Sequence, residues 1–91
     1  MPGVARHVRV TGRVQGVFFR AWARNHAERL GLNGWIRNCA DGAVEAHVEG
    51  DEAKVRWFVD VLNEGSPNAR VDHVRSNNAE FEGLSGFEVR R

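Results

Sequence analysis

Two hydrophobic periodicities follow one another along the chain, and their order constrains the fold more than any other feature of the sequence. Residues 4–11 alternate apolar and polar side chains, with the valines on one parity, which is typical of a half-buried strand. A stretch with two glycines follows at residues 12–20, and residues 21–30 then carry apolar side chains at helical spacing. The first third of the chain therefore predicts a strand, a loop and a helix.

Turn and cap signals place the next boundaries. Gly31 can take the left-handed conformation beyond a helix end near residue 30, and Leu32 can fold back onto the last turn. Residues 35–40 and 43–49 then flank Asp41 and Gly42, a pair that favours a two-residue hairpin turn. The sequence thus predicts a second and a third strand joined as a hairpin.

The third strand alternates strictly, which predicts one buried and one solvated face. Its apolar residues share one parity and its polar residues the other: Val44, Ala46 and Val48 against Glu45, His47 and Glu49. We therefore expect one face of the sheet to be wet.

The second half predicts another helix and two more strands. Asp51 and Glu52 suit the first turn of a helix, where the macrodipole favours negative charge. Its apolar stripe is Val55, Phe58, Val59 and Leu62. A break at residues 65–68 precedes a strand near Val71 and Val74, residues 76–85 carry no clear signal, and Phe87 and Val89 suggest a short last strand. This β-α-β-β-α-β order with a tail strand predicts a ferredoxin-like α/β (α+β) sandwich, with a mostly antiparallel sheet and both helices on one face.

Length and composition exclude several classes of protein. Ninety-one residues suffice for one small domain, expected over residues 1–91, and 42% hydrophobic with 27% charged residues is near the globular average. Neither a membrane-spanning run nor the apolar stretch of a signal peptide is present. The net charge of +1 is too mild to indicate nucleic-acid binding. The single Cys39 excludes an intramolecular disulfide, so we expect a soluble, cytoplasmic protein.

The glycine-containing loop at residues 12–20 is the first candidate for chemistry. Where a strand runs into a helix start, free backbone NH groups and the positive end of the helix dipole can hold an anion. Gly16 permits close approach of a ligand, and the guanidinium of Arg20 can grip two phosphate oxygens. The alternative is a plain connecting loop with a solvated Arg20, which composition alone favours. The loop matches neither a Walker sequence nor G-x-G-x-x-G.

Two longer motifs favour the anion-binding interpretation over a plain connecting loop, because both resemble the signatures of a known family. The stretch VTGRVQGVFFR at residues 10–20 resembles the first signature of the acylphosphatase family, and GWIRN at residues 34–38 resembles the second. Three further residues stand at the family spacing: Gly42, Val44 and Gly50.

The resemblance covers nearly the whole chain, with two departures from the family pattern. Residues 66–71 and 86–90 extend it beyond the two signatures. Ile36 stands where the family usually has a smaller residue, a packing change that leaves Asn38 in register, and Ala21 is less typical and affects the pocket edge.

The resemblance implies hydrolysis of a carboxyl-phosphate anhydride to a carboxylate and inorganic phosphate, without a metal or cofactor. It implies that Asn38 places the attacking water and that the phosphoryl group is held by Gln15, Gly16, Val17, Phe18, Phe19 and Arg20. The expected partner is a small-molecule acyl phosphate bound by a monomer, with no nucleic acid and no membrane.

The residue chemistry is consistent with this activity. A leaving carboxylate has a pKa near 4 and needs no general acid. A ring of NH groups with one guanidinium can stabilise the charge on the equatorial oxygens. The amide of Asn38 can orient water but cannot deprotonate it, so we expect the proton to go to a phosphoryl oxygen of the substrate.

Two other classes of function stay open. The chain could be a non-catalytic binding module, since ferredoxin-like sheets often bind RNA and the same loop could bind a phosphate without turning it over. Against RNA binding, valines occupy the strand positions where an RNA-binding sheet has exposed aromatics. The chain could instead correspond to one domain of a larger carbamoyl phosphate enzyme, of the kind that matures nickel-iron hydrogenases.

The remaining reactive residues are interpreted as structural. The four histidines have no metal-binding spacing, and the lone thiol of Cys39 is more often inert packing. We expect packing roles for Trp22, Trp35 and Trp57, the last on a flank of the second helix, and a solvated position for Glu45, Glu49, Asp51 and Glu52.

Overall fold

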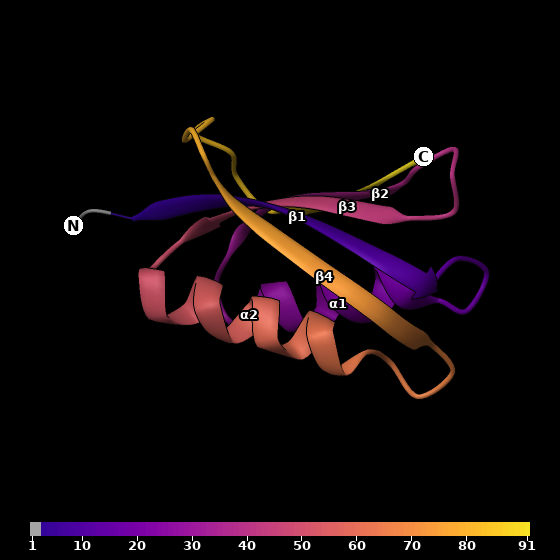
Figure 1. Ribbon diagram of the computed structural model, residues 1–91. Helices are drawn as coiled ribbons and strands as arrows, with labels where there is room; N and C mark the ends of the chain where they lie inside the picture. The colour runs from indigo at the N-terminus through magenta and orange to yellow at the C-terminus, as the bar shows by residue number, and fades with distance from the viewer. Residues whose placement is uncertain (1–2) are drawn as a thin grey trace.

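The structure, a computed structural model, describes residues 3–91. Its elements in chain order are β1 (Val4–Arg13), α1 (Phe19–Arg29), β2 (Asn33–Asn38), β3 (Val44–Gly50), α2 (Glu52–Glu64), β4 (Arg70–Ala79) and β5 (Phe87–Arg90). The sheet has the order β4-β1-β3-β2-β5, in which only the β2–β5 pair is parallel. Both helices lie against one face of the sheet (Figure 1). The predicted ferredoxin-like sandwich is confirmed.

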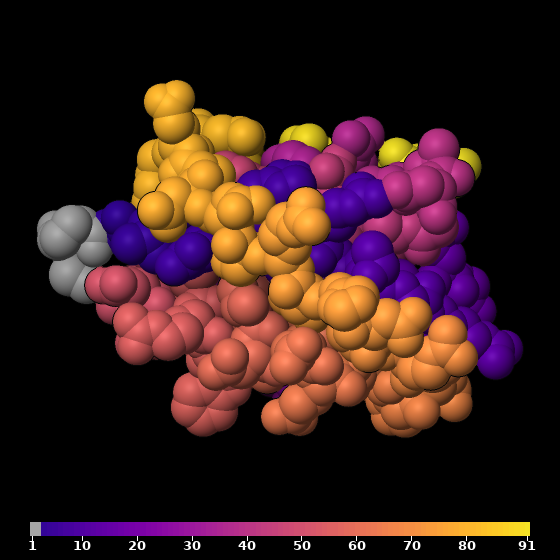
Figure 2. Space-filling model, viewed as in Figure 1, coloured from indigo at the N-terminus to yellow at the C-terminus, as the bar shows by residue number. Residues whose placement is uncertain are grey.

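The core lies between the sheet and the two helices. Apolar side chains of the three central strands meet those of both helices, and all are buried: Val8, Val10, Ile36, Val44, Ala46, Val48, Ala23, Ala27, Val55, Phe58 and Leu62. In the space-filling view α2 and β4 lie side by side, so the edge strand closes this side of the core (Figure 2). No helix within residues 3–91 is long and apolar enough to cross a membrane.

Helix α1 ends as predicted but begins two residues earlier than expected. Gly31 has a φ of 70°, its NH bonds the carbonyl of Glu28 at 3.1 Å, and the NH of Leu32 bonds that of Ala27 at 2.9 Å. This pair of bonds is the Schellman motif expected from a glycine at that position. The helix starts at Phe19, directly after the left-handed backbone of Phe18, and the Phe19 ring is buried in the core.

The hairpin is confirmed, but its predicted two-residue turn is wrong. The NH of Cys39 bonds the carbonyl of Ala43 at 2.8 Å, which leaves a three-residue loop between them. A two-residue type I′ turn needs positive φ at both central residues, and here Gly42 has one (93°) while Asp41 does not. The Asp41 side chain instead accepts the NH of Ala43 at 3.1 Å and pairs with Arg9 on β1.

Helix α2 has the predicted apolar stripe and acidic start, with Asp51 as its N-cap and Glu52 in its first turn, while Trp57 is placed contrary to expectation. The Asp51 side chain accepts the NH of Lys54 at 3.2 Å, and Val55, Phe58 and Leu62 are buried. The prediction that Trp57 packs on the helix flank is wrong, since its side chain is 65% exposed. Most of Trp57 is therefore in contact with solvent, whereas the neighbouring Phe58 is buried.

Strand β4 continues through the region that gave no clear sequence signal. It pairs with β1 up to Ala79, so its polar end, Ser76 to Asn78, is strand. An edge strand has one solvated side, and polar side chains there erase the alternation on which prediction depends.

The second face of the sheet is not uniformly wet, which corrects the expectation for Glu49. Glu49 and His47 are 1% and 3% exposed because the segment between β4 and β5 folds over them. His47 Nε2 lies 2.8 Å from Glu49 Oε2, and the carboxylate also accepts the backbone NH groups of Glu82 and Leu84. Glu49 therefore anchors this segment on the sheet.

We predict that Glu49 makes the stability of the fold depend on pH. Burial alone would raise the pKa of Glu49, but the NH groups of Glu82 and Leu84 together with His47 outweigh it and lower the pKa. A lowered folded-state pKa contributes stability above the unfolded value of about 4.3, and this contribution is lost as pH falls through the folded value. Glu49→Gln should lower the free energy of unfolding at pH 7 by about 1–3 kcal/mol and flatten its decline below pH 4.5.

Urea denaturation of both proteins at pH 7 and at pH 4 checks this prediction. Glu88→Gln is the matched control, since Glu88 is exposed on β5. An unchanged stability of Glu49→Gln at pH 7 would contradict the anchoring role.

Candidate active site

The loop between β1 and α1 is held by buried side chains at both ends. Val14 and Phe19 are each 1% exposed and fix the points where the loop leaves the strand and enters the helix. Between them Gly16 has a φ of 73°, while a Cβ built on it would meet nothing within 4 Å. Glycine is therefore favoured there by backbone conformation, with no requirement for space.

The start of α1 presents backbone NH groups without a side-chain cap. Phe18 occupies the N-cap position with left-handed backbone angles (φ 60°, ψ 24°), and no side chain accepts a hydrogen bond there. The NH of Trp22 makes the first intrahelical bond, to the carbonyl of Phe18 at 3.1 Å. The preceding NH groups and the positive end of the helix dipole thus meet at the loop, an arrangement that favours an anion.

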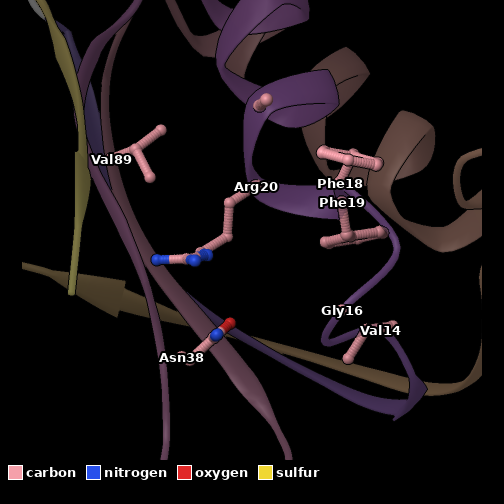
Figure 3. Close-up of a pocket in the computed structure, with 8 residues that line it drawn as sticks. Val14, Gly16, Phe18, Phe19, Arg20, Asn38 and Val89 are labelled. Carbon is pink, nitrogen blue, oxygen red and sulfur yellow. The ribbon is translucent and has the colours of Figure 1, made fainter.

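The fold brings Arg20 and Asn38 together although 18 positions separate them in the sequence. Both line a cavity of about 320 Å³ between the loop and the ends of β2 and β5. In Figure 3 the guanidinium of Arg20 and the amide of Asn38 point into the same space. The other lining residues are Val14, Gly16, Phe18, Phe19, Ala21 and Val89.

Arg20 is anchored by the last strand. Its Nη1 donates to the backbone carbonyl of Arg90 on β5 at 2.6 Å. A guanidinium has five N–H donors in a planar fork, so one can hold the strand while the others face the cavity. The same side chain borders an adjoining hollow of about 470 Å³ together with Asn38, Val89 and Arg91.

Asn38 has an unused acceptor. It ends β2, where it pairs with Val44 of β3, and its Oδ1 atom is buried without a hydrogen-bond partner. A buried unpaired acceptor costs about 1–3 kcal/mol and is uncommon in native proteins. The Asn38 side chain thus lines the cavity with one acceptor that no protein donor satisfies.

Two of the six loop residues expected to bind substrate do not line the cavity. Gln15 turns away, and its Nε2 donates to the carbonyls of Cys39 and Ala43, at 2.8 Å each, which ties the loop to the β2–β3 hairpin. Val17 packs partly buried against the core. Gly16, Phe18, Phe19 and Arg20 do line the cavity.

Val14 and Val89 line the cavity but were not predicted from the sequence. Val89 belongs to a strand 69 positions beyond Arg20, and only the parallel β2–β5 pairing brings it to the site. Ala21, noted from the sequence at the pocket edge, does line the cavity.

The other reactive side chains have structural surroundings. Trp22 packs on Phe19 with ring centroids 5.3 Å apart, and Trp35 stacks on His47 at 6.1 Å. The Cys39 sulfur lies 3.8 Å from Nη1 of Arg9. Within residues 3–91, His, Cys, Asp and Glu side chains form no group of three that could hold a metal ion.

Comparison with known proteins relates the chain to one family. A sequence model of the acylphosphatase family matches residues 6–89. An acylphosphatase of Haloarcula marismortui is 50% identical over 84 residues, which cover 92% of each chain. The structure of an acylphosphatase from Coxiella burnetii is similar with a TM-score of 0.93 and 40% identity, over 97% of this chain and 93% of that one.

The fold also occurs within a longer protein. Full-length HypF, crystallised in a phosphate- and nucleotide-bound form, is similar with a TM-score of 0.88 and 25% identity. That match covers 99% of this chain and 12% of HypF.

Proposed function

Because the chain belongs to the acylphosphatase family, we propose that its cavity is the active site, in which the loop and Arg20 hold a phosphoryl group and Asn38 places the attacking water. The chain is an acylphosphatase, a hydrolase that converts an acyl phosphate to a carboxylate and inorganic phosphate. The observation that carries the assignment of the site is the meeting of Arg20, a loop of uncapped NH groups and the unpaired Oδ1 of Asn38 in one cavity.

The phosphoryl group is held by backbone NH donors and by the positive charge of Arg20. The NH groups of the loop and the helix start face an anion, and the N–H groups of Arg20 that Arg90 does not use bind its oxygens. Charge that spreads over the equatorial oxygens in the transition state meets these fixed dipoles, so no metal is required for its stabilisation. Gln15 acts as a positioning residue, since its two bonds to the hairpin fix the loop relative to Asn38.

Asn38 orients the nucleophile. Its Oδ1 accepts one hydrogen of a water molecule, whose oxygen then forms a bond to phosphorus as the bond to the bridging oxygen breaks. The carboxylate leaves with the electron pair, and a proton of the water passes to a phosphoryl oxygen of the substrate. The amide itself takes no proton.

We predict that the enzyme hydrolyses acyl phosphates but not alkyl phosphate esters. The residues that line the cavity include no His, Asp, Glu or Lys. A carboxylate leaves unprotonated because its pKa is near 4, whereas an alkoxide needs a general acid, whose contribution is typically 10²–10⁴-fold. Phosphate release from benzoyl phosphate and from glycerol phosphate, measured with the same enzyme sample, compares the two. Hydrolysis of the anhydride and the ester at similar rates would contradict a site without a general acid.

The enzyme is further proposed to act as a single-domain monomer in the cytoplasm, on a small-molecule acyl phosphate. One sheet and one core account for the described residues, and Cys39, as a lone thiol, suits a reducing compartment.

A further inference from the structure

Phe18 combines two unfavourable features, an exposed apolar side chain and a left-handed backbone, that packing within the protein does not explain. Its side chain is 85% exposed, more than the other exposed large hydrophobic residues, Trp57 at 65% and Phe81 at 55%. Its backbone is also the one non-glycine case of positive φ in residues 3–91. A left-handed conformation costs such a residue roughly 1–2 kcal/mol, and glycine or asparagine would take it more readily.

The loop at residues 15–20, called the cradle from here on, accounts for the backbone of Phe18 but not for its side chain. The left-handed turn aims NH groups into the loop, which any residue tolerant of positive φ would do. The phenyl ring packs neither in the core cluster nor in an aromatic pair among the described residues. A large apolar side chain is thus presented to solvent at this position, where a ligand could cover it.

Phe18 is one of the residues that line the active-site cavity. Phe18 lines the cavity together with Arg20, and Val89 lines it from β5. In Figure 3 the ring of Phe18 and the side chain of Val89 lie on opposite sides of the Arg20 side chain. Since the loop at residues 15–20 is proposed to hold the phosphoryl oxygens together with Arg20, the acyl group is joined to them through one bridging oxygen and can reach these walls.

We propose that the exposed ring of Phe18, with Val89 opposite, binds the acyl group, so that the enzyme favours acyl phosphates with an apolar, planar acyl group over those with a small one. This inference rests on the function proposed above and names the substrate class of that site. An aromatic acyl group covers the ring of Phe18 in the bound state, whereas an acetyl group leaves most of it in water.

The test compares kcat/KM for benzoyl phosphate and acetyl phosphate in the wild-type enzyme and in Phe18→Asn. Asparagine tolerates the left-handed backbone and is a good N-cap, so the variant should fold. Both substrates carry the same phosphoryl group, and the ratio of their kcat/KM values cancels any effect on the cradle. We expect Phe18→Asn to lower the benzoyl-to-acetyl ratio by about fivefold to tenfold, the equivalent of one aromatic contact with its buried surface.

Two further variants make the result specific. Phe18→Trp keeps an aromatic face at the cavity and should retain the high ratio. Phe81→Asn removes the other exposed phenylalanine, which follows β4 beyond Ala79, beside the start of β1 and away from the loop at the end of β1, and should leave the ratio unchanged.

The possible failures are distinguishable. If the wild type hydrolyses both substrates and Phe18→Asn leaves their ratio unchanged, or lowers both rates equally, the acyl-binding role of Phe18 is wrong while the proposed function stands. If the wild type hydrolyses neither substrate, the proposed function is wrong, and the inference with it.

Discussion

Replacing Arg20 by lysine should lower kcat for benzoyl phosphate at least about 10²-fold, which is about 2.7 kcal/mol of transition-state stabilisation. The charge is kept, but an ammonium cannot reproduce the planar fork that reaches the carbonyl of Arg90 and the phosphoryl oxygens together. The loss should appear mainly in kcat because charge on the equatorial oxygens is stabilised most in the transition state. Steady-state kinetics at saturating substrate measure it.

Arg29→Lys is the matched control for this substitution. Arg29 lies in the last turn of the same helix, is exposed and does not line the cavity. Near-wild-type turnover of Arg20→Lys would exclude a bidentate guanidinium contact as the source of the stabilisation.

Asn38→Ala should reduce turnover far more than it weakens phosphate binding. The unpaired Oδ1 of Asn38 is proposed to hold a water molecule, and the orientation of that water matters in the transition state. We expect kcat to fall by about 10²–10³-fold, as for loss of one fixed donor at a reacting centre, while inhibition by inorganic phosphate changes little. Asn38→Asp should impair both, since a carboxylate repels the phosphoryl group.

Asn25→Ala on the exposed side of α1 serves as the control for the loss of an amide. If Asn38→Ala weakens phosphate binding as much as it slows turnover, Asn38 is a binding residue and does not position water.

Local signals in the sequence were sufficient for most of the fold. The acidic start of α2, the glycine stop at Gly31 and the apolar stripe of α2 depend on neighbours within one or two turns, and each is confirmed. The hairpin was predicted on the same basis, but its loop length was not, because one positive-φ residue fits a three-residue loop as well as a two-residue one.

Features that depend on distant segments were not predictable. Glu49 alternates like a solvated residue, and only the segment that carries Glu82 and Leu84 buries it. Trp57 is the opposite case: Val55 and Phe58 beside it on α2 are core residues, yet Trp57 itself stays 65% exposed.

In the candidate site, too, features set by local sequence were predictable and features set by distant segments were not. The strand-loop-helix pattern indicated an anion site and Arg20, but composition alone could not prefer it over a plain loop. The expectation for Asn38 came from family resemblance, and its unpaired Oδ1 is visible only in three dimensions. The contribution of Val89, the anchoring of Arg20 by Arg90 and the outward turn of Gln15 all depend on strand pairing or hydrogen bonds between separate elements.

The most direct test of the proposed mechanism is hydrolysis of benzoyl phosphate, followed by loss of its ultraviolet absorbance, with and without EDTA, for the wild type, Arg20→Ala and Asn38→Ala. We expect turnover that survives the chelator and is lost in both variants. Turnover that EDTA abolishes would contradict a metal-free site. A folded wild type that binds phosphate but shows no turnover would contradict the enzymatic role itself and favour a phosphate-binding module.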